Sequence, residues 1–323
     1  MPPAEMDRIT LNAVDFSAAA VAPDTRMVNQ AVIKALSAIP DRATVPPAVA
    51  RKARLEGRGP FPLPPESTRA RELTIDGPHG PVGLRVHWPD GAPQGVYLHL
   101  HGGGWTIGSP RENDNGNDRI AARTGYAVVS VRYRLAPEHP YPQGLDDCEA
   151  AALWLARVAG EMFGTDRLAI GGESAGANLA AAVLVRLRDR HQLSPFGRAV
   201  LIAGCFDLRL TPSARLWGET PLVLNTQDIA QFVTHYLSGG GAADDPDVSP
   251  LLADLAGLPP ALFVVGAQDA LLDDTLFMSA RWLAAGNGAD LLVAPGGAHV
   301  FVRFPGSAAD AANARIDTFL SAR

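Results

Sequence analysis

The most constraining feature of this sequence is the run AIGGESAGANLAAAVL (169–184), in which one serine lies between two glycines. Apolar residues lead into the glycines and a helix-length segment follows them, so the run predicts a strand, a sharp turn and a helix. Ser174 stands at the turn, between Gly172 and Gly176. A serine there either caps the helix or is a nucleophile raised from the end of a sheet. The second interpretation requires a base and an acid elsewhere in the chain.

Apolar runs alternate with helix-length segments on both sides of this turn. Because strands buried on both faces of a parallel sheet are nearly continuously apolar, we expect strands at 95–102, 126–133, 166–172, 198–206, 261–267 and 289–296. Helices are expected at 26–39, 144–162, 177–191, 225–239 and 275–288. Two earlier runs, at 71–76 and 83–88, are suited to an antiparallel edge. The alternation predicts a doubly wound α/β core.

Two parts of the chain fall outside this alternation. Helical periodicity near the N-terminus is followed by a Pro-rich passage at 58–69, which is typical of a linker. From about residue 207 to 250 there is no clear strand, and this interval is too long for a simple connection. We therefore expect N-terminal cap helices over 1–55, a cap insertion over 207–250, and a core formed by 56–206 and 251–323.

Bulk properties exclude several classes of protein. The 323-residue chain has a formal net charge of −6, which argues against nucleic acid or an anionic membrane as a partner. Neither a membrane span nor a signal peptide is recognisable, so we expect no membrane insertion and a cytoplasmic location. The two cysteines, Cys148 and Cys205, lie in apolar segments and are expected to be buried free thiols. We expect neither a metal site nor a cofactor.

The candidate base must follow the serine if the chain has the order Ser, acid, His. Three histidines do so. His191 ends a polar helical segment, and His235 lies in the expected cap helix, where surface or packing roles are commoner. His299 lies in PGGAHVF, a glycine-rich loop directly after the last expected strand. We therefore predict that His299 is the base.

The candidate acid is expected in the loop after the preceding strand. The run ALFVVGAQDALLDD supplies Asp269 directly beyond the strand, with Asp273 and Asp274 a turn later. Asp269 is closest to the strand end and is our predicted acid. Asp273 is left as an alternative that supports the site or begins a helix, where a carboxylate is favoured by the helix dipole.

A third element, HGGGW (101–105), directly follows the expected strand GVYLHL. Successive glycines allow a close backbone approach and inward-facing N–H groups, which can stabilise a developing oxyanion. The element resembles the oxyanion loop of lipases and esterases. The expected donors are the N–H groups of Gly103, Gly104 and Ala175, which follows the serine. Gly102 is an adjoining candidate. His101 is expected to shape the loop.

Together these motifs resemble the hormone-sensitive-lipase-like (bacterial family IV) esterases of the α/β-hydrolase superfamily. The resemblance is carried by HGGGW (101–105), YRLAPEHPYP (133–142), GESAG (172–176), and DALLDD (269–274) followed by His299. It covers roughly residues 70–323. It implies an α/β-hydrolase fold, with a mostly parallel eight-stranded sheet flanked by helices and covered by a helical cap. It also implies hydrolysis of short- to medium-chain carboxylic esters without a metal or cofactor.

The sequence departs from this family in three places. Glu173 stands where Asp is commoner, Ala270 replaces the usual Pro, and Val300 replaces the usual Gly. We expect each to affect substrate range more than activity. Members of the family often form homodimers through the last strand and helix, which correspond to residues 289–323 here. A homodimer is therefore possible for this chain, but no residue pattern requires it.

The expected function is hydrolysis of a small-molecule ester through Ser174, His299, Asp269 and an acyl-enzyme. An amidase, carbamate hydrolase or lactone hydrolase on the same residues is the alternative, and a small-molecule receptor on a hydrolase scaffold is a more remote one. Apolar residues near the site or in the cap are candidates for the substrate pocket. They are Trp105, Phe206, Trp217, Val300 and Phe301.

Overall fold

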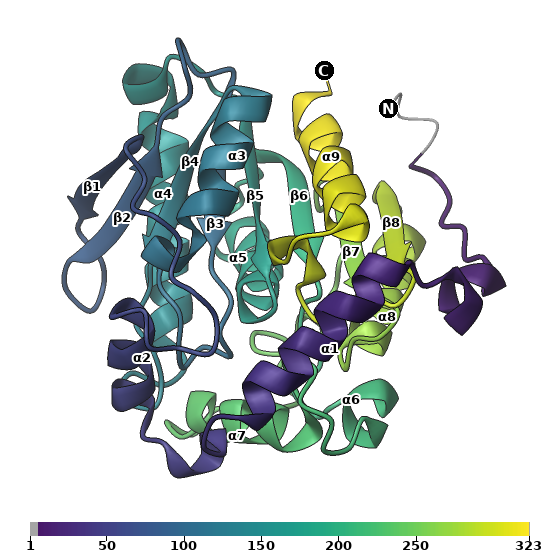
Figure 1. Ribbon diagram of the computed structural model, residues 1–323. Coiled ribbons are helices and arrows are strands. Elements are labelled where there is room, and N and C mark those ends of the chain that lie inside the picture. The colour runs from purple at the N-terminus through teal and green to yellow at the C-terminus, as the bar shows by residue number, and fades with distance from the viewer. Residues whose placement is uncertain (1–5, 323) are drawn as a thin grey trace.

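The computed structural model describes residues 6–322, and these residues form one eight-stranded sheet with helices on both faces (Figure 1). The strand order is β1-β2-β4-β3-β5-β6-β7-β8. Strand β2 is antiparallel to both β1 and β4, and the remaining pairs are parallel. The strands are β1 (Ala70–Ile75), β2 (Val82–His87), β3 (Gly95–Leu100), β4 (Tyr126–Arg132), β5 (Leu168–Glu173), β6 (Phe196–Ile202), β7 (Ala261–Gly266) and β8 (Ala289–Ala294).

Helices occupy most of the intervals between the strands. The α-helices are α1 (Pro23–Ser37), α2 (Pro47–Leu55), α3 (Asp114–Thr124), α4 (Gln143–Phe163), α5 (Ala175–His191), α6 (Pro212–Leu216), α7 (Thr226–Tyr236), α8 (Leu272–Ala284) and α9 (Ser307–Ser321). Short 3₁₀ helices are η2 (Ala13–Phe16), η3 (Ala18–Ala20), η4 (Arg42–Thr44), η5 (Pro110–Asn113), η6 (Pro250–Leu252) and η7 (Phe301–Arg303).

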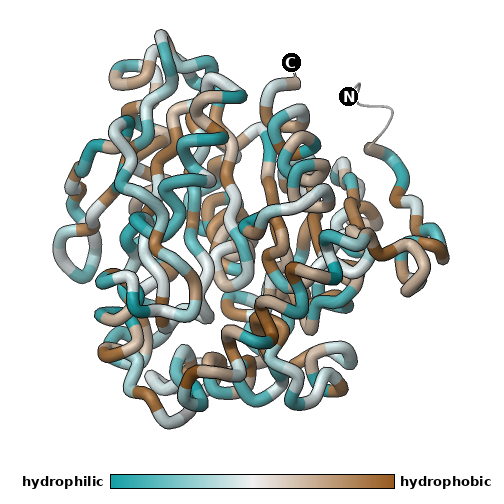
Figure 2. Tube along the Cα trace, viewed as in Figure 1, coloured by the Kyte–Doolittle hydropathy of each residue, from teal (hydrophilic) through white to brown (hydrophobic). Residues whose placement is uncertain are grey.

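The two faces of the sheet have separate apolar cores because successive strand residues point to opposite sides. On one face, Leu98 and Ile170 pack in a cluster with residues of α4, α5 and α8. On the other face, Tyr97 and Ala169 pack in a cluster with residues of α3 and α9. In Figure 2 hydrophobic residues run along the central strands, as burial on both faces requires. Both faces of the sheet are therefore buried beneath helices.

The N-terminal helix and the interval after β6 meet beyond the carboxyl edge of the sheet. In Figure 1, α1, α2, α6 and α7 all lie at this end of the molecule. Val32 and Leu36 of α1 share a small apolar cluster with Leu222 and with Ala298, which immediately precedes His299. This cluster joins segments that are distant in the chain, and it packs against the loop that carries His299.

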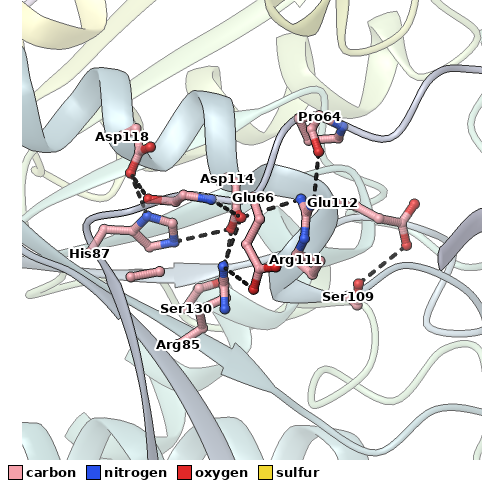
Figure 3. Close-up of polar contacts among 12 residues, drawn as sticks. Pro64, Glu66, Arg85, His87, Ser109, Arg111, Glu112, Asp114, Asp118 and Ser130 are labelled. Carbon is pink, nitrogen blue, oxygen red and sulfur yellow. Dashed lines mark hydrogen bonds and ion pairs between the residues drawn. The ribbon is translucent and has the colours of Figure 1, made fainter. Parts of the chain in front are cut away.

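The Pro-rich passage is held against the core by a buried polar cluster (Figure 3). Asp114, at the start of α3, accepts two hydrogen bonds from Arg85 at 2.7 and 2.8 Å. Asp114 also accepts the Ser67 N–H at 2.9 Å, and Arg111 donates to the Pro64 carbonyl at 2.7 Å. The passage predicted as a linker is thus tied to η5 and α3, and through Asp114 to β2.

The expected sheet is confirmed, including the antiparallel edge formed by the two early strands. The hydrophobic pattern did not predict α3, α6 or α9; for α9, only the family resemblance implied a last helix. The sequence of α3 is largely polar, but α9 carries a usable signal, because its buried Ala309, Ala312, Ile316 and Phe319 recur at helical spacing. Within residues 6–322, no helix is both long and apolar enough to cross a membrane.

Candidate active site

Ser174 lies at a strained turn between β5 and α5. Its backbone has φ 57° and ψ −123°, a conformation that residues with a side chain rarely adopt. The Ser174 N–H donates to the Ile202 carbonyl at 2.8 Å, which fixes the turn to the neighbouring strand. A Cβ atom at Gly172 or Gly176 would collide with the Leu100 carbonyl oxygen. The two glycines therefore permit the close packing that holds Ser174 at the end of the sheet.

The structure brings Ser174, His299 and Asp269 together from three separate loops. The Ser174 Oγ to His299 Nε2 distance is 2.9 Å. His299 Nδ1 lies 3.0 Å from each carboxylate oxygen of Asp269. Asp269 and His299 are only 2% and 3% exposed, so water screens their interaction little. The arrangement can hold the imidazole with Nδ1 protonated and Nε2 free to accept the serine proton.

The other histidines and acids considered from the sequence lie elsewhere. His191 is exposed at the end of α5, where its Nε2 is 2.7 Å from Glu149. His235 is half-buried on α7. Asp273 accepts the Ser213 N–H at 2.8 Å and thereby contacts the segment that follows β6. Within residues 6–322, the Ser174 hydroxyl is hydrogen-bonded to His299 and to none of these three side chains.

Asp274 is a fully buried carboxylate one turn beyond Asp269. It accepts the N–H groups of Phe206 and Asp207 at 2.7 and 2.9 Å, and the Thr211 hydroxyl at 2.6 Å. Burial raises the pKa of Asp274 to about 7, although these three hydrogen bonds oppose the rise. Asp274 thus joins the beginning of α8 to the segment that leaves β6.

The glycine loop after β3 presents free backbone donors beside Ser174. Gly103 and Gly104 have φ values of 120° and 57°, which favour glycine. In the described part of the chain, the N–H groups of Gly103, Gly104 and Ala175 have no acceptor. Gly102 differs from the sequence expectation, because its N–H already donates to Glu173 Oε1 at 3.2 Å. The candidate donor set therefore narrows to Gly103, Gly104 and Ala175.

Glu173 was noted in the sequence only as a departure from the family pattern. Its carboxylate is 2.9 Å from His99 Nε2 and 3.8 Å from an Arg303 nitrogen. Burial alone would raise the pKa of Glu173, but His99, Arg303 and the Gly102 N–H outweigh burial and lower it to about 2. Glu173 is therefore ionised and contacts both the glycine loop and the segment that follows His299.

His101 lies at the start of the glycine loop, where its ring contacts the loop backbone and Tyr133. Its Nδ1–H donates to the Gly102 carbonyl at 2.8 Å, and its ring stacks on Tyr133 with centroids 4.2 Å apart. Burial lowers the pKa of His101 to about 4, so the ring is neutral at physiological pH. These contacts agree with the expectation that His101 shapes the loop.

A small apolar pocket opens beside Ser174. Of the five candidates chosen from the sequence, Trp105 lines it. Phe206 is fully buried in the core, Trp217 packs in the α1 cluster, and Val300 and Phe301 pack on the α9 side of the sheet. The remaining lining residues are Gly104, Ser174, Ala175, Cys205, Leu224, Ile229, Phe232 and Leu271.

Four of these lining residues were not predicted from the sequence, because tertiary packing decides which apolar residues face a pocket. They are Cys205, Leu224, Ile229 and Leu271. Leu224, Ile229 and Phe232 belong to α7 or to the residues just before it. Ile229, Phe232 and Val233 on α7 have the helical spacing of a buried face, and this signal could have identified the wall of the pocket. The two cysteines are free and buried, as expected.

Comparison with known proteins identifies the class to which this fold and site belong. A family model described as the alpha/beta hydrolase fold matches residues 97–303. The esterase LipI of Mycobacterium tuberculosis is 35% identical over 277 residues, which cover 80% of this chain and 83% of LipI. The carboxylesterase NlhH of the same species is 35% identical over 239 residues, covering 69% of this chain and 72% of NlhH. The chain therefore belongs to the alpha/beta hydrolase family.

Solved structures agree with this assignment. A hyperthermophilic esterase from Pyrobaculum calidifontis superposes with a TM-score of 0.83 at 30% sequence identity, covering 93% of this chain and 98% of that one. A hormone-sensitive lipase from a metagenome library superposes with a TM-score of 0.80 at 30% identity, with the same coverage. The hormone-sensitive-lipase-like branch predicted from the four motifs is thereby confirmed, as is the fold class.

Proposed function

We propose that this protein, a serine carboxylesterase by its family and relatives, uses Ser174 as the nucleophile. His299 accepts the serine proton as Ser174 Oγ attacks the acyl carbon, and Asp269 stabilises the imidazolium that forms. The single observation that carries the proposal is the chain of contacts from Ser174 through His299 to Asp269, with separations of 2.9 and 3.0 Å.

The tetrahedral intermediate needs donors for its oxyanion. The N–H groups of Gly103, Gly104 and Ala175 are available for it, and Ala175 also lies at the first position of α5, where the helix dipole favours negative charge. The intermediate collapses as the bond to the leaving alkoxide breaks, and His299 gives its proton to that alkoxide. A water molecule deprotonated by His299 then attacks the acyl-enzyme, which releases the acid and Ser174.

We further propose that the acyl group is short to medium in length. The pocket beside Ser174 is small and its walls are mostly apolar, which suits a short apolar acyl group. Phe232 and Ile229 close one side, so a long acyl chain would have to displace α7. Small-molecule esters are thus the proposed substrates.

Hydrolysis of p-nitrophenyl esters from acetate to palmitate tests this proposal. We expect kcat/KM to be highest at short or medium chains. The Ser174→Ala variant should lose about 10⁴-fold or more in kcat, because the residues of such a triad act as a unit. Ser194→Ala, which changes an exposed serine, is the matched control and should retain wild-type activity. Full activity in Ser174→Ala would contradict the assignment of the nucleophile.

A further inference from the structure

Arg42 of η4 connects the N-terminal segment to the wall of the acyl pocket. Its Nη1 is 3.0 Å from Asp228 Oδ2, in the first turn of α7. Its Nη2 donates to the Val223 carbonyl at 3.3 Å. Its guanidinium carbon lies 5.5 Å from the centre of the Phe232 ring, within the range of a cation–π contact. One side chain therefore contacts three points along residues 223–232.

The segment held by Arg42 supplies three pocket-lining residues. Leu224, Ile229 and Phe232 are all buried and face the pocket beside Ser174. Phe232 also rests on the glycine loop, since a Cβ atom at Gly104 would occupy the space of its ring. The position of α7 therefore determines the space left for an acyl chain.

Arg42 itself does not line the pocket. Its side chain is 24% exposed and that of Asp228 is 11% exposed, so their ion pair is partly shielded from water. Asp228 also forms a capping box with Asn225, in which each side chain bonds the other residue's backbone N–H. The Arg42 contact is thus made to the capped first turn of α7.

We propose that Arg42 is a specificity-determining residue that sets acyl-chain selectivity by fixing α7 against the glycine loop. This inference rests on the proposed esterase function. The planar guanidinium is suited to the task because it can pair with a carboxylate, donate to a carbonyl and stack on a ring at the same time. Loss of Arg42 frees the α7 wall to move outward, which admits longer acyl chains.

The test compares p-nitrophenyl octanoate with p-nitrophenyl acetate in wild type and Arg42→Gln. The ratio of the two kcat/KM values does not depend on the fraction of protein that is folded. We expect this ratio to rise on the order of tenfold, because small changes in an apolar pocket produce discrimination of that size. Arg42→Lys keeps the charge but not the planar fork, so its ratio should be intermediate.

Two further variants separate a specific effect from a general one. Arg58→Gln removes another N-terminal arginine, one paired with Glu56 and largely exposed, and should leave the ratio unchanged. Asp228→Asn should raise the ratio by less than Arg42→Gln does, because Arg42 keeps its contacts with the Val223 carbonyl and the Phe232 ring. The double variant should shift the ratio no further than Arg42→Gln alone, because that change already breaks the ion pair. An unchanged ratio in Arg42→Gln would overturn the proposal.

Hydrogen exchange distinguishes failure of this inference from failure of the esterase proposal. In Arg42→Gln, amides of α7 should exchange faster than in wild type, whereas those of β3 and β5 should be unaffected. This readout needs no substrate. Absence of ester hydrolysis in wild type would contradict the proposed function, while equal α7 exchange in the two proteins would contradict the role of Arg42.

Discussion

At the scale of single residues, Glu173 shows how a side chain outside the reacting groups can position them. It directly precedes Ser174, accepts the Gly102 N–H at 3.2 Å and lies beside His99 and Arg303. Its ionised carboxylate thereby joins the serine turn, the glycine loop and the segment after His299. We interpret Glu173 as a positioning residue, because its contacts are with the surrounding protein and it leaves the Gly103 and Gly104 donors free.

Glu173→Gln tests this interpretation. Gln can still accept the Gly102 N–H but lacks the charge that pairs with His99 and Arg303. We expect kcat on a short ester to fall about tenfold with little change in KM, a smaller loss than the 10²–10³ for removal of an oxyanion donor. Glu161→Gln, at an exposed position of α4, is the matched control. Unchanged kcat in Glu173→Gln would contradict the positioning role.

The same variant has a predicted pH dependence of stability. Because the folded-state pKa of Glu173 is about 2, below its ordinary value of 4.5, the charge stabilises the fold above about pH 4.5. This contribution is lost as the pH falls toward 2. The free energy of unfolding, measured in urea, should therefore differ between wild type and Glu173→Gln at pH 7 by a few kcal/mol. At pH 3 the difference should be smaller.

At the scale of elements, Asp274 joins α8 to the segment that follows β6. An aspartate whose folded pKa is near 7 takes up a proton on folding between pH 4 and 7, so it makes the fold less stable as pH rises through that range. Asn is uncharged, and it can accept the N–H groups of Phe206 and Asp207 while its amide donates to Thr211 Oγ1. Substitution can therefore remove the pH dependence and keep the junction.

Asp274→Asn is predicted to gain stability relative to wild type as pH rises. At pH 5 the two melting temperatures should be similar, and at pH 8 the variant should melt a few °C higher, since each unit of pKa difference is worth about 1.4 kcal/mol. Thermal unfolding at the two pH values checks this. The control is Asp310→Asn, at an exposed position of α9. A difference between variant and wild type that is the same at both pH values would contradict the prediction.

At the scale of the whole molecule, the parallel strands explain why distant residues meet. Ser174, His299 and Asp269 follow β5, β8 and β7, whose carboxyl ends lie at one edge of the sheet. The sequence predicted this meeting because apolar strands and the order of the loops are local signals. It could not predict that Gly102 is bonded to Glu173 or that Ile229 faces the pocket, because both depend on packing between elements far apart in the chain.

The central claim is that Ser174 is the nucleophile activated by His299, and covalent trapping tests it most directly. The protein is treated with p-nitrophenyl diethyl phosphate, digested and analysed by peptide mass spectrometry. We predict one diethylphosphoryl group on Ser174, released p-nitrophenolate in matching amount, and no such adduct in Ser174→Ala. An adduct on a different residue, or no adduct in a preparation that hydrolyses esters, would contradict the account.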